Sequence, residues 1–483
     1  MRRLKIYSLV AAMAMISSCQ KSLLYPTPTT QISDISAFDT PERIFGQVYG
    51  LYGQLKDGNF FGERYQIYNE VRGEEFINLK GNAFTALQTW NFSVNSNAQE
   101  VENLWSSAYK TINATNVFLD GMTAKGNTIV DAATADNYTG EAKFIRGLSF
   151  YSLLQLYARP YWDNPTTNPG LVIYLEGNKN PASYQKARST VADSYKQALS
   201  DLDSAENLLP ESYEDNSKGQ NTTRATKGAA IAIKTRVYLS MGNYDQVIAE
   251  ANKIVSPAAP FQSSAGLALV ANIKDAFASI NTTENIFSLP FTSADVDAPG
   301  TQNSFAEYFL PSSLGGKAEY SLNASGIVAE ATWGASDARR DFVTISGGSP
   351  YLIKFSTPSP YTDWAPIIRY SEVLLNLAEA LVRKNNTVNA QAVALLSAVR
   401  HRSDPSVTYT TASFASATAL LDAILLERRI EFLGEGLRGP DITRQGIAFP
   451  AKGAASSTAP TSPNYIWPMS ADELNQNKLA VPN

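Results

Sequence analysis

The chain has 483 residues, of which 44% are hydrophobic and 18% charged, as expected of a globular protein with a large core. Its formal net charge of −5 provides no basic field for nucleic acid, so we expect no nucleic-acid partner. A single cysteine, Cys19, and a single histidine, His401, exclude an intrachain disulfide and leave a zinc site short of ligands, so we expect no metal and no cofactor.

The start of the chain has the three parts of a secretory signal peptide. Basic residues precede an apolar run over 6–16, which is too short for a membrane span of about 20 residues, and small residues then lead to Cys19. This ending resembles the bacterial lipoprotein box, in which the cysteine is acylated and becomes the first residue. We therefore predict a signal peptide over 1–18 and a lipidated tether over 19–35. The alternative is an incidental cysteine in a removed leader.

Helical periodicity dominates the chain after the tether. In "PERIFGQVYGLYGQL" the apolar residues recur at spacings of three and four, and Pro41 stands where the first turn of a helix tolerates proline. Similar patterns predict helices over 100–120, 138–158, 190–209, 225–241, 243–256, 366–384, 388–402 and 417–436. Within 227–255 and 369–403 they form pairs that resemble tetratricopeptide helix hairpins. The predicted fold is mainly α, with these hairpins as its scaffold.

The segment over 257–362 has a different composition. Pro, Gly, Ser and Thr cluster there, and the runs "NIFSLPF" and "PYLIKF" predict a few short strands. Long irregular insertions on a rigid scaffold often carry binding surfaces. We therefore expect a loop-rich flank within one compact unit, made of an N-terminal half over 36–256 and a C-terminal half over 257–483.

The string "GEGLRG" matches the glycine spacing of a dinucleotide-binding motif through Gly434, Gly436 and Gly439. That motif needs a strand before it, whereas a charged helical pattern precedes these glycines. We interpret them as a helix terminus followed by loop glycines.

A glycosidase needs two carboxylates at one site. Glu74 and Glu75 are adjacent and are expected to point to different sides. Three glutamates share a predicted helix face with two nearby arginines, which predicts ion pairs: Glu427, Glu431, Glu435, Arg428 and Arg438. No catalytic constellation remains, and we expect no enzymatic activity.

Seven segments in order closely resemble the SusD/RagB family of outer-membrane nutrient-binding lipoproteins of Bacteroidota: "FDTPERIFGQVYGLY", "LWSSAYKTINATNVFL", "EAKFIRGLSFYSLLQLY", "KGAAIAIKTRVYLSMGNYDQVIAEANKIV", "IIRYSEVLLNLAEAL", "AILLERRIEFLGEGLRGPDITRQG" and "WPMSADELNQN". The resemblance implies a lipid-anchored protein, displayed at the cell surface, that passes oligosaccharides to a SusC-like TonB-dependent transporter. It also implies that the helical scaffold packs against the transporter and that the loop-rich side holds the ligand. The alternatives are a RagB-like component for peptide or protein uptake and, less favoured, a glycoside hydrolase.

Sugar rings stack their C–H faces on aromatic planes, so aromatic residues in predicted loops are the candidate ligand contacts. Trp90 is the strongest candidate, because it precedes an Asn- and Ser-rich stretch in a region that lines the glycan site in several family members. The other candidates fall into two groups. Phe61, Tyr65 and Tyr68 lie near Trp90 in the sequence, and the loop-rich flank contains Tyr308, Phe309, Tyr320 and Trp333. The alternative for each ring is burial in the core, which we assign to Trp105.

Overall fold

The computed structural model describes four stretches of the chain: residues 36–178, 184–214, 219–294 and 297–483. The predicted signal peptide, the anchor Cys19 and the tether up to residue 35 lie outside these stretches. The described part is mainly helical with a few short strands, which confirms the predicted fold class.

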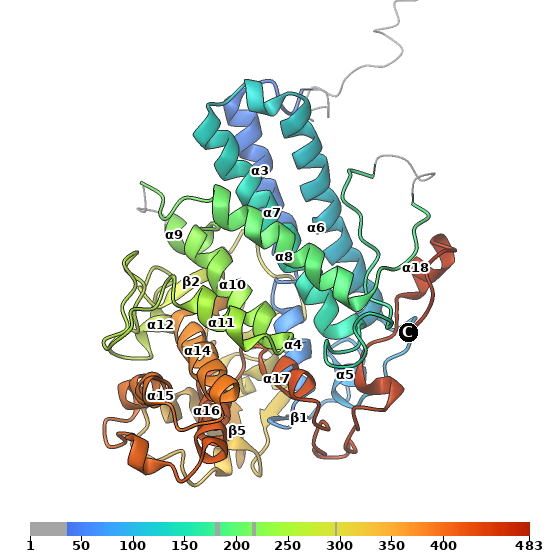
Figure 1. Cartoon of the computed structure of the whole chain (residues 1–483). Helices are drawn as coiled ribbons and strands as arrows, with labels where there is room; N and C mark the ends of the chain where they lie inside the picture. Colours follow the sequence, from blue (N-terminus) through green and yellow to red (C-terminus); the bar gives the residue numbers. More distant parts are fainter. Residues whose placement is uncertain (1–35, 179–183, 215–218, 295–296) are drawn as a thin grey trace, which may run out of the picture.

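Four long helices form the upper half of the molecule in Figure 1: α3 (Pro41–Leu55), α6 (Gln99–Ala124), α7 (Ala132–Tyr157) and α8 (Val191–Leu208). Three of them begin at a side-chain cap. Thr40, Asp131 and Thr190 each accept a hydrogen bond from the backbone N–H three residues further along. These caps fix where the helices begin, and α3 and α7 then pack on α6.

Two helix hairpins follow where the sequence predicts them: α10 (Lys227–Ser240) with α11 (Tyr244–Ala251), and α14 (Tyr370–Asn385) with α15 (Ala390–Ser403). In the first turn Gly242 has a φ of +68°, which glycine adopts without strain. Asn243 then caps α11 by accepting from the N–H of Gln246 at 3.3 Å. Because α11 also packs on α14, the two hairpins form a continuous scaffold.

The helix predicted over 366–384 begins later than expected. Residues Ala365–Arg369 form strand β6, which pairs antiparallel with β2 (Asn285–Leu289), and Arg369 lies opposite Asn285. Helix α14 therefore starts at Tyr370. The pairing partner lies far away in the sequence, so the local helical pattern did not reveal it.

The glycines of "GEGLRG" end one helix and enter the next. Helix α16 (Ala417–Glu431) stops short of the predicted residue 436, and Gly434 and Gly436 follow it with φ values of +85° and +81°. Gly439 lies inside α17 (Arg438–Gln445), not in a loop as predicted. A helix, not a strand, precedes the motif, so it is no dinucleotide fingerprint.

In the described stretches the strands form three two-stranded antiparallel sheets. Besides β2 with β6, β1 (Phe76–Asn78) pairs with β3 (Tyr320–Leu322), and β4 (Val343–Ser346) pairs with β5 (Ser349–Leu352). The predicted strand runs "NIFSLPF" and "PYLIKF" correspond to β2 and β5.

The remaining helices are short: α4 (Arg64–Val71), α5 (Leu87–Trp90), α9 (Gln220–Thr223), α12 (Asp275–Ala278), α13 (Phe305–Phe309) and α18 (Ala471–Gln476). The main hydrophobic cluster draws residues from Ala37 to Ala480, so both halves of the chain share one core. None of the helices in the described stretches is both long and apolar enough to cross a membrane.

Ion pairs occupy the glutamate face of α16, as predicted, but with other partners. Glu431 pairs with Arg369 and Arg339, each at 2.9 Å, in the interior of the protein. The predicted partners turn elsewhere, since Arg428 pairs with Asp441 at 2.9 Å and Arg438 pairs with Glu74 at 2.5 Å. This face of α16 points into the core, where residues distant in sequence supply the positive charges.

Glu74 and Glu75 do meet at one partner, contrary to the prediction. Arg429 Nη2 lies 3.1 Å from Glu74 and 2.6 Å from Glu75. Both carboxylates are therefore engaged in ion pairs. Their role is structural, and they form no free acid–base pair.

Candidate ligand-binding pocket

All eight aromatic residues proposed as ligand contacts are buried, and each exposes 6% of its surface or less. Each ring therefore has the core position that the sequence analysis gave as its alternative. They pack against each other and against neighbouring rings: Tyr308 stacks on Tyr320 with ring centroids 6.0 Å apart, and Phe61 lies 4.8 Å from Tyr65. The loops around them fold inward, and the rings fill the space beneath.

Trp90 is held in the core by contacts that its local sequence does not indicate. Its indole Nε1 donates to the carbonyl of Phe76 at 2.8 Å, and the Lys452 ammonium lies 5.8 Å from its ring. Lys452 itself is buried, and its Nζ donates to the carbonyl of Val71, the last residue of α4, and to those of Arg72 and Gly73 just beyond the helix, the latter two at 2.7 Å. Trp90 is thus part of the packing that holds α4, α5 and β1 together.

Trp333 has the core position that the sequence offered as its alternative. It is 2% exposed, and the Arg340 guanidinium stacks on its ring at 4.0 Å.

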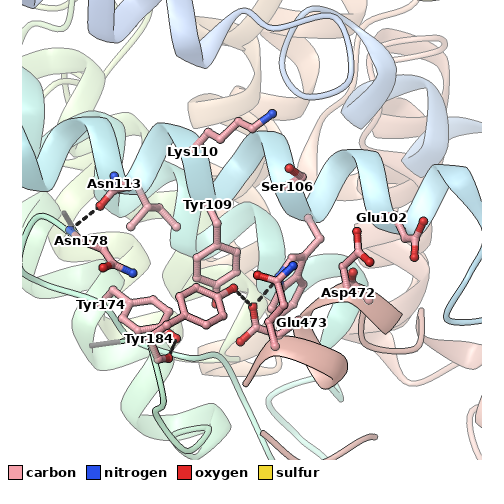
Figure 2. A pocket seen from close by; sticks show the side chains of 14 residues that line it. Glu102, Ser106, Tyr109, Lys110, Asn113, Tyr174, Asn178, Tyr184, Asp472 and Glu473 are labelled. Atoms are coloured by element: carbon pink, nitrogen blue, oxygen red, sulfur yellow. Dashed lines mark hydrogen bonds between the residues drawn. The ribbon is translucent and has the colours of Figure 1, made fainter. Parts of the chain in front are cut away.

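An open pocket lies between α6, α18 and the segment around Tyr174 and Tyr184 (Figure 2). Its volume is about 290 Å³. It is lined by Glu102, Trp105, Ser106, Tyr109, Lys110, Ile112, Asn113, Tyr174, Asn178, Tyr184, Ser470, Asp472, Glu473 and Gln476. The loop-rich segment over 257–362 contributes none of these residues, so the pocket is not on the side where the resemblance places the ligand.

Three half-buried tyrosines form the aromatic wall of the pocket. The rings of Tyr174 and Tyr184 are stacked at 5.6 Å with an interplanar angle of 19°, and Tyr109 meets Tyr174 edge-on at 6.1 Å. Tyr109 Oη donates to the carbonyl of Val172 at 2.9 Å and accepts from its N–H at 3.2 Å, which fixes the ring. A rigid aromatic surface of this kind suits a ligand with flat apolar faces.

Glu473 of α18 fixes one end of the tyrosine wall through hydrogen bonds. Its carboxylate accepts hydrogen bonds from the Tyr184 hydroxyl, from Trp105 Nε1 at 3.3 Å and from Asn477 Nδ2 at 2.8 Å. Burial, and then the hydrogen bond to Glu473, raise the pKa of Tyr184, so its hydroxyl remains a donor at neutral pH. Glu473 is only 2% exposed, and its role is to position Tyr184.

The rim of the pocket is polar. Asn113 Oδ1 accepts from the backbone N–H of Asn178 at 2.7 Å, and Ser106, Lys110 and Gln476 are exposed. Amides, hydroxyls and charges around an aromatic wall can hydrogen-bond a polyhydroxylated ligand while the wall contacts its C–H faces. Within the described stretches no group of three or more His, Cys, Asp or Glu side chains is arranged to hold a metal ion.

The sequence of α6 indicates one side of this pocket. Glu102, Ser106, Tyr109 and Asn113 recur at helical spacings, which places a tyrosine on a polar face of α6. The opposite side of the pocket could not be predicted from local sequence, because α18 lies far along the chain. Trp105 and Glu473 are separated by 368 residues.

Comparison with known proteins places the chain in a family. A family model described as "Starch-binding associating with outer membrane" matches residues 29–239, and a model of the SusD family matches residues 353–483. The crystal structure of a SusD superfamily protein from Bacteroides fragilis is 31% identical to this chain, with a TM-score of 0.81. The alignment covers 92% of this chain and 99% of the other. The chain belongs to the SusD/RagB family. A comparison with curated proteins gives no match.

Other solved structures share the fold at lower identity. A laminarin-binding SusD-like protein is 19% identical with a TM-score of 0.71, and surface glycan-binding protein A from Bacteroides uniformis is 19% identical with a TM-score of 0.73. Each alignment covers 92% of this chain and 99% of the other. In this SusD-family chain, the two regions matched by family models meet at the pocket, since the first supplies its tyrosines and the second supplies α18.

Proposed function

We propose that this SusD-family protein captures oligosaccharides in the pocket between α6 and α18 and delivers them to a SusC-like TonB-dependent transporter, without cleaving them. The observation that carries the proposal is the rigid tyrosine wall beside a polar rim, in a chain whose family model is described as starch-binding. Relatives that bind laminarin and other glycans share its fold, which supports a saccharide as the ligand.

The pocket geometry fits part of an oligosaccharide. Its volume of about 290 Å³ lies just below the range of typical ligand pockets, which hold about 300–1,000 Å³. A short stretch of the saccharide would fill it, with a ring against Tyr174, and the rest of the chain would lie over the exposed rim.

Capture without chemistry requires placement at the membrane. In the proposal, acyl chains on Cys19 anchor the protein in the outer membrane beside the transporter, with each buried CH₂ group contributing about 0.8 kcal/mol. Of the carboxylates that line the pocket, Glu473 is already committed to three donors.

The test is a calorimetric titration of a soluble form that starts at Gln20 with laminarin, starch and chitin oligosaccharides. Replacing Tyr174 by alanine should weaken binding of the preferred saccharide by about 1–3 kcal/mol, as loss of a central aromatic contact does. Tyr49→Ala is the matched control, since Tyr49 is 47% exposed on α3 and does not line the pocket.

Three results would contradict the proposal. Equal affinities of wild type and Tyr174→Ala, with both folded, would move the ligand elsewhere. Binding of peptides in place of saccharides would favour the RagB-like alternative. Shortened saccharides after prolonged incubation would indicate a hydrolase.

A further inference from the structure

A second open cavity lies where the segment after α7 meets the C-terminal segment. Its volume is about 300 Å³, and it shares no lining residue with the pocket between α6 and α18. The C-terminal segment contributes Pro463 and Ile466 to its lining. The segment after α7 contributes four polar side chains: Arg159, Asp163, Asn164 and Asn168. The function proposed above uses none of these residues.

Part of the hydrogen-bonding capacity of these polar side chains is unused. The amide nitrogens of Asn164 and Asn168 donate to Asp163, at 3.1 Å and 2.7 Å, but neither amide oxygen accepts a hydrogen bond from a described residue. Arg159 donates through Nε to Asp163 and through Nη2 to the carbonyl of Pro460, both at 2.6 Å, and its Nη1 has no partner among the described residues. Two acceptors and one donor are therefore positioned by the fold and open to the hydroxyl groups of a ligand.

Trp162, the residue before Asp163, carries an indole ring that is exposed and yet fixed. It is 47% exposed, whereas the other five tryptophans of the chain are buried or half-buried. Its Nε1 donates to the carbonyl of Thr443 in the last turn of α17 at 2.8 Å. The ring also packs on Gly446, where a Cβ would lie 3.2 Å from it. An exposed ring held in one orientation can contact a flat apolar face at little cost in side-chain entropy.

Tyr465 connects the indole with the cavity. The Arg159 guanidinium lies 5.6 Å from the centre of the Tyr465 ring, and the Tyr465 hydroxyl donates to the carbonyl of Ile447 at 2.7 Å. Ile447 follows Gly446 directly and is itself 44% exposed. The indole and the cavity therefore belong to one surface. Because Trp162 does not line the cavity, a ligand must extend out of the cavity to reach the ring.

We propose that this surface is a second saccharide-binding site, which takes neutral oligosaccharides. A sugar ring contacts the exposed face of Trp162 through its C–H groups. Hydroxyl groups of a neighbouring sugar unit hydrogen-bond the side chains of Asn164, Asn168 and Arg159. The ion pair between Arg159 and Asp163 offsets the charges of the cavity, which favours a neutral ligand. The inference rests on the proposed function, because it adds a further site for the same class of ligand.

Calorimetric titration of the soluble chain with starch, laminarin and chitin oligosaccharides tests the inference. It compares wild type, Trp162→Ala, Tyr174→Ala and the double variant. We expect Tyr174→Ala to keep a weaker class of sites, and the double variant to bind at that class at least about fivefold more weakly, as loss of a central aromatic contact implies. Asn164→Gly should weaken the same class, and glycine accepts the φ of +47° at this position without strain. Tyr49→Ala is the matched control, since Tyr49 is also 47% exposed and lines neither pocket.

Tryptophan fluorescence reports on this site directly. Trp162 is the one exposed tryptophan of the chain, so acrylamide should quench it more than the other five. Saturating saccharide should reduce the quenching in wild type and in Tyr174→Ala. It should leave the quenching of Trp162→Phe nearly unchanged, because that variant keeps an aromatic ring at the site but lacks the reporting indole.

The outcomes separate this inference from the proposed function. Complete loss of saccharide binding in Tyr174→Ala, or saccharide binding that never protects Trp162 from acrylamide, overturns the inference while the pocket between α6 and α18 stands. Binding that depends on Trp162 and not on Tyr174 supports the inference and overturns that pocket. Unchanged saccharide binding by Trp162→Ala, with loss of co-purification with the transporter, would make this surface a protein contact and overturn the inference. Absence of binding of every saccharide to wild type overturns both.

Discussion

Replacing Trp90 by alanine should destabilise the folded protein strongly, and should do so without acting through a ligand. The indole is 6% exposed, its Nε1 donates to the Phe76 carbonyl, and the Lys452 ammonium lies over its ring. The Trp90→Ala variant removes all three contacts and opens a cavity between α5 and β1.

The magnitude follows from burial and the lost hydrogen bond. Truncating a buried tryptophan to alanine costs about 3–5 kcal/mol of unfolding free energy. The buried carbonyl of Phe76 also loses a partner, and an unsatisfied buried acceptor costs about 1–3 kcal/mol on its own. These costs overlap, so we expect a total loss of at least about 3 kcal/mol.

Guanidinium unfolding followed by circular dichroism measures this loss. The matched control is Phe84→Ala, because Phe84 is 55% exposed and a surface truncation usually changes stability by less than about 0.5 kcal/mol. A Trp90→Ala variant that loses less than about 1 kcal/mol, while its saccharide affinity drops, would refute the core assignment and return Trp90 to the ligand site.

Three further changes test other parts of the account. Gly439→Ala should cost about 1–3 kcal/mol of unfolding free energy, because its Cβ would lie 2.5 Å from the Asn69 carbonyl oxygen, and an unchanged denaturation midpoint would show that α17 can shift. Glu431→Gln should cost about 3–5 kcal/mol at pH 7 by leaving its buried arginine partners without their full countercharge, and wild-type stability here would argue against the network. Burial raises the pKa of Glu431, but its arginines outweigh burial and hold it well below the usual range. Its contribution is therefore present above the unfolded-state pKa of about 4.3 and lost as the pH falls below it, so urea titrations should show wild-type stability declining between pH 5 and pH 2 more steeply than that of Glu431→Gln. Cys19→Ala should leave a folded protein that no longer sediments with membranes, and retention after a high-salt wash would contradict lipidation.

The helical scaffold could be predicted because its signals are local. In α10 and α11 the apolar spacing, Gly242 and Asn243 all lie within one short stretch of sequence, and the structure confirms the hairpin. The strand that replaced the first turn of the helix predicted over 366–384 depended on distant partners. Arg369 pairs there with Glu284, which is 85 residues away, and no local pattern reports such a contact.

The aromatic residues of the candidate site could not be sorted by sequence alone. Tyr320 and Tyr174 both stand in segments of irregular composition, yet β3 buries the first completely, whereas the second remains half-exposed beside α6. Which face of a ring meets solvent is decided by segments that pack on it from elsewhere in the chain. The pocket therefore depends on the packing of α18 opposite α6, which the local sequence does not indicate.

The central claim is that saccharides bind against the tyrosine wall between α6 and α18. A crystal structure of the soluble chain, soaked with the oligosaccharide that binds tightest in the titrations, tests it most directly. We expect a sugar ring against Tyr174, with its hydroxyl groups near the exposed polar residues of the rim. Saccharide density on the loop-rich flank instead, over the exposed side chain of Leu314, would contradict it.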